Sequence, residues 1–299
     1  MADYAGCVNE DFLTRVKELA GDATKGPALL DVIGAEAGRV VEAMRDGSLA
    51  AKGVAFSNEE LVRRVAVYEA LAEDLGRAAA VLGYWSEAAD PRLLPWIVQR
   101  LANAVERGEG TVPWLELFRY PALLVTYAAG LGAVIGGREG ALGPLLTRPI
   151  IGENEGWQPA ATHLPSGAVL SGDMPKRLPG LEGRRTPLSD HLMETTRPWL
   201  EELEPDQVAF ERAFDRYEFL AGLLMFDLTR GDNGRGWGPI GRFLWRSAYG
   251  GGIIEEVGAE LNANSSAWPL VRAGAFRGSG ERAAESFRGY LAHLRQIHV

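Results

Sequence analysis

The sequence predicts an all-α protein, a multi-helix bundle of roughly ten helices with a long central loop rich in proline and glycine. Three observations predict this fold class. Apolar residues recur three or four positions apart along most of the chain, glycine and proline gather in a few breaks, and no alternating apolar and polar series indicates a set of strands. Hydrophobic residues make up 46% and charged residues 24% of the 299 residues, the balance of a folded globular protein.

The strongest helix signal covers residues 57–85. Ser57 and Glu60 have the spacing of a capping box, in which the two side chains satisfy amide groups of the first helical turn. The apolar residues that follow at helical spacing are Leu61, Val65, Tyr68, Leu71, Leu75, Ala79 and Leu82. Similar patterns predict helices over 9–20 and 27–45.

Asp90 and Pro91 predict the start of a further helix that runs to about residue 107, because Asp is a preferred cap and Pro a preferred first helical residue. The next segment, 120–137, carries no charge over 18 residues. Without its Tyr-Pro start and Gly-Gly end it has about 14 residues, so we predict a buried core helix and expect no stable membrane span. A shorter helix over 138–147 would complete this block.

From residue 148 to 185 proline and glycine recur too often for a long helix, which predicts an irregular loop with a short hairpin around 168–170. This loop divides the chain into an N-terminal helical block, 1–147, the linker 148–185, and a C-terminal helical block, 186–299. One continuous domain is the alternative. The helices predicted after the loop cover 186–203, 205–229, 253–263 and 280–297, with a glycine-rich break over 230–242.

Composition and motifs exclude several classes of protein. A net charge of -9 argues against a general nucleic-acid binder, although a local basic patch stays open. Cys7 is the only cysteine and the first residues lack the apolar stretch of a signal peptide, so we expect a reducing, cytoplasmic location. The chain has no phosphate-binding, dinucleotide-binding, nucleophile-elbow, zinc-protease or calcium-loop motif, so no cofactor and no metal are predicted.

The central loop is the first place to expect a binding site, because long loops in compact proteins often carry function. Arg184 and Arg185 could hold a carboxylate or phosphate through forked hydrogen bonds, and Trp157 could anchor an interface. The other basic residues proposed for binding are Lys176 and Arg177. The alternative is a solvated connector.

His163, His191 and Glu194 are the candidate catalytic residues. His191 and Glu194 are three positions apart on one predicted helix, close enough to share a proton or a metal, but no third ligand is evident. In an atypical enzyme, His163 or His191 would transfer protons while Arg184 and Arg185 held an anionic substrate. The alternative interpretation is that His191 is a surface or partly buried hydrogen-bonding residue near the start of a helix.

Glu211, Asp215 and Glu218 form an acidic row at helical spacing, interleaved with Arg212 and Arg216. Charges mixed in this way are typical of a solvated helix face with local ion pairs. We therefore expect this row to be exposed, and not to act as paired carboxylates in acid-base chemistry.

Two blocks, VYEALAEDLGRAAAVLGYW and FRYPALLVTYAAGLGAVIGGREGALGPLL, resemble helical regions of bacterial multidomain proteins, including Schlafen/AlbA-type and other phage-defence-associated proteins. The resemblance implies an accessory or sensing role in intracellular defence. No effector domain is recognisable in this sequence, which leaves open a fragment, a stand-alone relative or an unrelated protein. We therefore predict a noncatalytic helical module that binds a protein partner or a small anionic ligand. The alternatives are the atypical enzyme and, third, a membrane-inserting effector.

Overall fold

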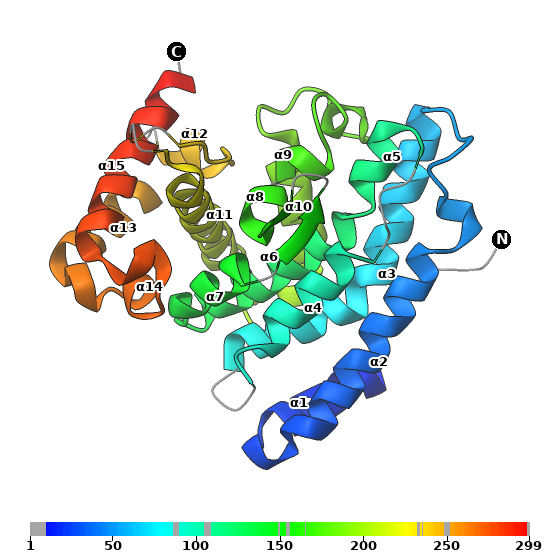
Figure 1. The fold of residues 1–299 in the computed structure, drawn as a ribbon, viewed down its shortest axis with the longest axis horizontal. Helices are drawn as coiled ribbons and strands as arrows, with labels where there is room; N and C mark the ends of the chain where they lie inside the picture. Colours follow the sequence, from blue (N-terminus) through cyan, green and yellow to red (C-terminus); the bar gives the residue numbers. More distant parts are fainter. Residues whose placement is uncertain are drawn as a thin grey trace.

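The computed structural model describes residues 10–297, except residues 86–89, 105–108, 149, 154–155, 165, 232–233, 235 and 248–251. Cys7 lies outside this part of the chain. The described residues form helices joined by short turns and one two-stranded hairpin, so the predicted all-α class is confirmed (Figure 1). The helix predicted from Asp90 ends earlier than expected, since α4 covers Leu93–Ala102.

The centre of the fold is the pair formed by α3 (Asn58–Trp85) and α6 (Tyr120–Ile135). Their backbones touch through small residues: a Cβ added to Gly132 would lie 2.1 Å from the carbonyl oxygen of Ala80, and one added to Gly83 would lie 2.2 Å from that of Ala129. Only glycine permits this approach. The Ser57 hydroxyl caps α3 as predicted, because it accepts a hydrogen bond from the Glu60 amide at 3.1 Å.

The apolar helix α6 is buried on all sides. Every residue from Tyr120 to Ala133 is buried, including Thr126, whose hydroxyl donates to the carbonyl oxygen of Ala122 at 2.7 Å. The longer stretch Val112–Ile135 is apolar enough to cross a membrane by length and composition, and 89% of its most apolar window is buried inside the protein. In this fold the segment therefore has the surroundings of a core helix.

The N-terminal helices pack against this central pair. They are α1 (Glu10–Ala20), α2 (Gly26–Met44), α4, and α5 (Val112–Leu117). Near α5, Arg64 of α3 is completely buried. Its guanidinium donates to the carbonyl oxygens of Leu49 and Ala50, both at 2.8 Å, and to the Glu60 carboxylate at 2.6 Å, and it stacks 4.5 Å from the Trp114 ring centre.

The central stretch after α7 (Leu142–Thr147) is more ordered than a plain loop. It contains strands β1 (Ile150–Glu153) and β2 (Gly156–Pro159), which pair antiparallel, and the short helices α8 (Ala160–His163) and α9 (Ser166–Val169). A short hairpin was predicted in this stretch and is present, but its position was wrong: it lies at 150–159, whereas α9 covers 166–169 and Val169 and Leu170 are buried in the core. The buried apolar residues of this stretch are Ala160, Ala161, Leu164, Val169, Leu170, Met174, Leu178 and Leu181.

The C-terminal part is built around α11 (Gln207–Thr229), which lies between the C-terminal helices and the α3–α6 pair (Figure 1). On one side α11 contacts α6 and α10 (Pro187–Leu200), and on the other it contacts α13 (Ile253–Asn264) and α15 (Gly280–Ile297). Two short helices, α12 (Phe243–Ser247) and α14 (Pro269–Arg272), were not predicted. Buried residues from both predicted helical blocks and from the stretch between them belong to one hydrophobic core.

Candidate functional site

The candidate catalytic residues have different neighbours. His191 of α10 lies with Nε2 2.7 Å from Oε1 of Glu69, an oxygen that also accepts the Tyr120 hydroxyl at 2.8 Å. Glu194 is half exposed and faces Arg184 at 3.6 Å. His163 ends α8, in the central stretch. Although both are described residues of α10, no hydrogen bond or ion pair joins His191 to Glu194.

The basic residues predicted to bind are also held by different partners. Lys176 pairs with Asp173 at 3.1 Å, and the Arg177 guanidinium donates to the Asn58 side chain at 3.1 Å. Arg185 stacks 4.7 Å from the ring centre of Trp245 and has no acidic partner within 4.0 Å among the described residues. Trp157 belongs to β2, and its side chain lies outside the described part of the structure.

One of these residues, Arg185, lines a surface cleft of about 230 Å³. Its walls come from the central stretch, the start of α10 that follows it directly, and the distant residues 236–242, which we call the strap. The residues that line the cleft are Gly167, Leu170, Gly172, Pro175, Arg185, Thr186, Pro187, Leu188, Ser189, Trp237, Pro239 and Ile240. Trp237 is 45% exposed, although it is a large apolar side chain.

The strap is fixed to the helices beneath it. The Tyr290 hydroxyl of α15 donates to the carbonyl oxygen of Pro239 at 2.5 Å, and the amide of Trp237 donates to the Thr229 hydroxyl at 2.8 Å. The amide of Arg242 donates to the Ser189 hydroxyl at 3.0 Å. The strap is therefore a rigid wall of the cleft, and not a loose connection between helices.

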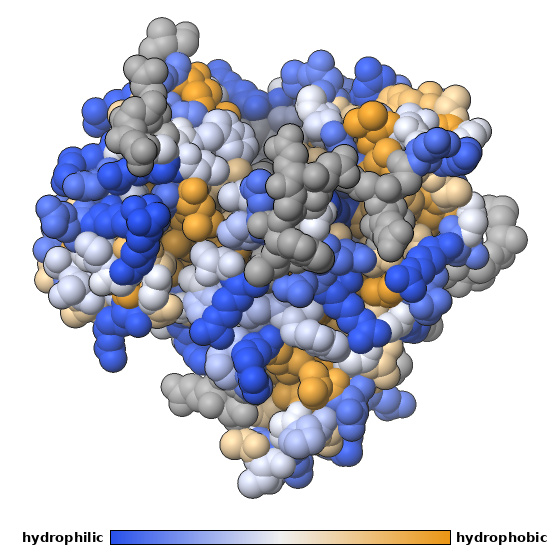
Figure 2. Space-filling view, in the orientation of Figure 1, coloured by the Kyte–Doolittle hydropathy of each residue, from blue (hydrophilic) through white to orange (hydrophobic). Residues whose placement is uncertain are grey.

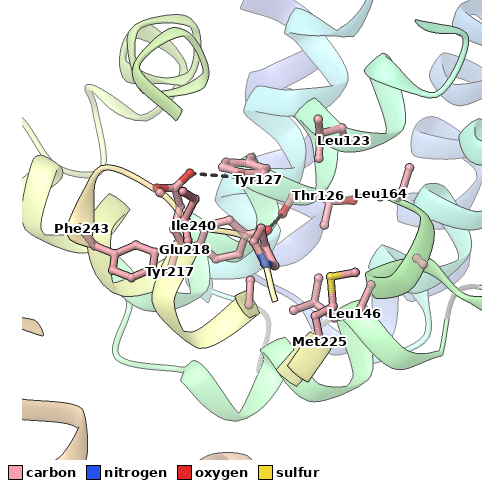
Figure 3. A pocket seen from close by; sticks show the side chains of 15 residues that line it. Leu123, Thr126, Tyr127, Leu146, Leu164, Tyr217, Glu218, Met225, Ile240 and Phe243 are labelled. Atoms are coloured by element: carbon pink, nitrogen blue, oxygen red, sulfur yellow. Dashed lines mark hydrogen bonds between the residues drawn. The ribbon is translucent and has the colours of Figure 1, made fainter. Parts of the chain in front are cut away.

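Behind the strap lies a smaller cavity of about 40 Å³, which Pro239 and Ile240 line from the other side. It has room for a few water molecules, since one water needs roughly 10–15 Å³ by this measure. Figure 3 shows the Glu218 carboxyl group directed toward Tyr127 at its edge. The Tyr127 hydroxyl donates to Oε1 of Glu218 at 3.1 Å, and the Ser189 hydroxyl donates to Oε2 at 2.6 Å.

The acidic row on α11 faces the interior, so the prediction of a solvated face was wrong. Asp215 is 4% and Glu218 6% exposed. The row faces two cations, Arg242 at the end of the glycine-rich break and Arg246 of α12. Arg242 lies 2.7 Å from Glu211 and 3.2 Å from Asp215, and Arg246 also pairs with both carboxylates. These cations compensate buried negative charge, which is the physical reason that the row can turn inward.

The interleaved arginines lie on a neighbouring side of α11, since one residue turns a helix by about 100°. Arg216 pairs with Glu139 and Glu260, and Arg212 pairs with Glu256 of α13. The sequence contained a signal that the acidic row and the arginines belong to different faces of α11. The acidic row continues along the same helical face to Gly222 and Met225, which favours burial of that face, whereas the arginines lie one residue further around the helix.

Burial changes how the inward row titrates. Loss of solvent raises the pKa of Glu218 to about 8, and hydrogen bonds from Ser189 and Tyr127 only partly oppose this rise. Loss of solvent also raises the pKa of Asp215 to about 6, against the attraction of Arg242 and Arg246. Burial opposes ionisation of Glu211 as well, but hydrogen bonds from Gln207 and Arg246 outweigh it and lower the pKa. At neutral pH Glu218 is therefore mainly an uncharged acid.

A second concave surface lies between α2 and α4 and measures about 730 Å³. Figure 2 shows apolar surface there, and Leu30 is 47% exposed. Its cation, Arg92, forms a forked pair with Asp90 at 2.6 Å, so this groove offers a ligand apolar contact with its positive charge already compensated.

No protein-family model matches the sequence, and no curated protein and no solved structure matches it either. Among the described residues, no group of three or more His, Cys, Asp or Glu side chains could hold a metal ion. The features of this protein that bear on function are therefore the cleft and the buried carboxyl groups behind it.

Proposed function

We propose that this protein is a noncatalytic binding module that holds a small ligand in the cleft between the central stretch, α10 and the strap. One observation carries the proposal: an exposed Trp237 and Arg185, which has no acidic partner within 4.0 Å among the described residues, line the same cleft. Removing exposed aromatic surface from water favours binding. A guanidinium without an acidic partner also favours binding when the ligand brings an anionic group that accepts its hydrogen bonds.

The framework around the cleft supports binding without chemistry. Ser189 lines the cleft and also donates to Glu218, whose other oxygen is held by Tyr127. The carboxyl group thus positions one wall of the cleft from behind. The enzyme alternative needs His163 or His191 beside Arg185, but neither histidine lines the cleft, and His191 lies against Glu69.

The resemblance to helical regions of bacterial defence proteins supports the same kind of role. In those proteins the helical region is an accessory to an effector, and a ligand-binding cleft is what a sensing accessory requires. We propose that the protein acts as a sensor or scaffold within such an intracellular system.

The test is a fragment screen in which binding in the cleft is detected by a fluorine NMR resonance of Trp237. The full chain is labelled with 5-fluorotryptophan, and the Trp237 resonance is assigned with a Trp237→Phe variant. We expect a subset of small ligands to shift the Trp237 resonance and to leave that of Trp96, which lines the α2–α4 groove, in place. A screen in which ligands shift Trp96 and never Trp237 would contradict the proposal.

A further inference from the structure

We infer that the ligand of the cleft is a small aromatic monocarboxylate, with its carboxylate on Arg185 and its ring against Trp237. This inference depends on the proposed function and adds the chemical class of the ligand. It comes from the charge, the size and the lining of the cleft.

The charge of the cleft favours a single negative charge. Arg185 is its one cationic lining residue among the residues described. The nearby cations Arg242 and Arg246 are committed to Glu211 and Asp215. A phosphate monoester carries roughly 1.5 to 2 negative charges at neutral pH, whereas a carboxylate carries one and matches the guanidinium fork. A single guanidinium therefore suits a carboxylate best.

The guanidinium is held ready for such a group. It stacks on the Trp245 ring at 4.7 Å, and this ring belongs to α12, which Arg246 fixes to α11 through Glu211 and Asp215. A stacked guanidinium keeps its plane fixed while the edge with its N–H groups stays available. Less side-chain entropy is then lost when an anion binds.

The other residues that line the cleft indicate the chemistry of the part of the ligand that is not its carboxylate. Apart from Arg185, Thr186 and Ser189, the side chains in the cleft are apolar, and they include the flat faces of Trp237, Pro175 and Pro239. Flat apolar faces favour a planar ring. A volume of about 230 Å³ is small beside the roughly 300–1,000 Å³ of pockets for drug-sized molecules. One ring with a short carboxylate arm fits these limits.

The test compares phenylacetate, its neutral isostere phenylacetamide, and phenyl phosphate, titrated into the 5-fluorotryptophan-labelled full chain at neutral pH. We expect phenylacetate to shift the Trp237 resonance at the lowest concentration. An Arg185→Gln variant should weaken phenylacetate binding by about tenfold, as expected for loss of a hydrogen bond to a charged group, and should leave phenylacetamide unchanged. Trp237→Ala, read by isothermal titration, should weaken both.

Arg184→Gln is the matched control. Arg184 adjoins Arg185 in sequence but pairs with Glu194 and does not line the cleft, so its removal should change phenylacetate affinity by less than about twofold. Thermal unfolding of each variant verifies that it folds, since both arginines are exposed.

Four outcomes would overturn the inference. Equal affinity for phenylacetate and phenylacetamide, insensitive to Arg185→Gln, would show that charge is not recognised. Tighter binding of phenyl phosphate would show that the cleft takes a doubly charged group. If none of the three probes shifts the Trp237 resonance but other fragments do, the ligand class is wrong and the proposed function stands. If no compound shifts the Trp237 resonance, the inferred ligand and the proposed function both fail.

Discussion

Arg64 in the N-terminal half and Glu218 in the C-terminal half are both removed from solvent, with 0% and 6% of their surfaces exposed, but their surroundings differ. Arg64 donates to two carbonyl oxygens and one carboxylate, and its plane is covered by Trp114. Glu218 is held by two hydroxyl groups, lies at the edge of a cavity, and carries a pKa that burial raises to about 8.

This difference in surroundings separates Arg64, a structural group, from Glu218, a group that adjoins the candidate binding site. A buried cation such as Arg64, whose three guanidinium nitrogens each donate to an oxygen of the protein, stabilises the fold. A buried acid with little compensating charge costs free energy when it ionises, and such groups gather where proteins bind ligands. In this chain the buried acid is Glu218. It lies directly behind the wall of the cleft, because Ser189, which lines the cleft, donates a hydrogen bond to it.

The largest effect that this comparison predicts is at Arg64. Arg64→Met should lower the free energy of unfolding by about 3 kcal/mol or more, because the carbonyl oxygens of Leu49 and Ala50 lose their donors. Arg63→Met, at the neighbouring and 43% exposed side chain, should cost below about 1 kcal/mol. Urea denaturation of both variants measures the two values; equal losses would show that Arg64 has no special structural role.

Glu218→Gln should change how stability depends on pH. The folded pKa of about 8 exceeds the ordinary value of 4.5, so the folded protein holds a proton that the unfolded chain releases. Between pH 4.5 and 8 the stability of the natural protein therefore falls as pH rises, by a few kcal/mol at most, and Glu218→Gln removes this fall. Denaturant unfolding between pH 6 and 8 is the cleanest window, since Asp215, with a pKa of about 6, contributes below it.

Glu211→Gln is the control of opposite sign. The pKa of Glu211 is lowered in the folded state, so its carboxylate stabilises the protein at neutral pH and this contribution is lost on acidification. The variant should be less stable than the natural protein at pH 7, and the gap should close as pH falls through the carboxyl range. The stability difference from the natural protein should change with pH in opposite directions for Glu218→Gln and Glu211→Gln. A change in the same direction for both would contradict the opposite pKa shifts of the two carboxyl groups.

Gly241→Ala tests the contact between the strap and Glu218. A Cβ at Gly241 would lie 2.0 Å from Oε2 of Glu218, so the strap or the carboxyl group must move. We expect a loss of about 1–3 kcal/mol in unfolding free energy, together with weaker binding in the cleft. Gly183→Ala, where an added Cβ meets no atom within 4 Å, should stay within about 0.5 kcal/mol of the natural protein.

The smallest effects concern two residues that the sequence suggested for binding. Lys176 pairs with Asp173 and Arg177 contacts Asn58, and neither lines the cleft. Lys176→Ala and Arg177→Ala should therefore change phenylacetate affinity by less than about twofold. A tenfold loss in either variant would move the anion site away from Arg185.

Much of the fold could be predicted from periodicity and caps. Helices predicted over 27–45, 205–229 and 253–263 correspond to α2, α11 and α13, because the spacing of apolar residues records which helix face is buried. Short elements such as α12 and α14 escaped prediction. They contain one turn or little more, so they carry no periodic pattern, and packing in three dimensions determines them.

The site could be predicted only in part. The central stretch and Arg185 were proposed as binding features, and both line the cleft. Glu218 and Asp215 were not, because local charge alternation suggested pairing with Arg212 and Arg216. Asp215 pairs instead with Arg242 and Arg246, 27 and 31 residues further along the chain, and Glu218 is held by the hydroxyl groups of Tyr127 and Ser189. A charged residue's burial depends on such distant partners, which no local pattern reveals.

The most direct test of the central claim is a crystal structure of the protein grown with 4-bromophenylacetate, read from the anomalous signal of the bromine atom. We predict a single strong bromine peak in the cleft beside Trp237, with the carboxylate in hydrogen-bond contact with Arg185. A peak in the α2–α4 groove beside Leu30 and Trp96, with the cleft empty, would contradict the assignment of the cleft as the binding site.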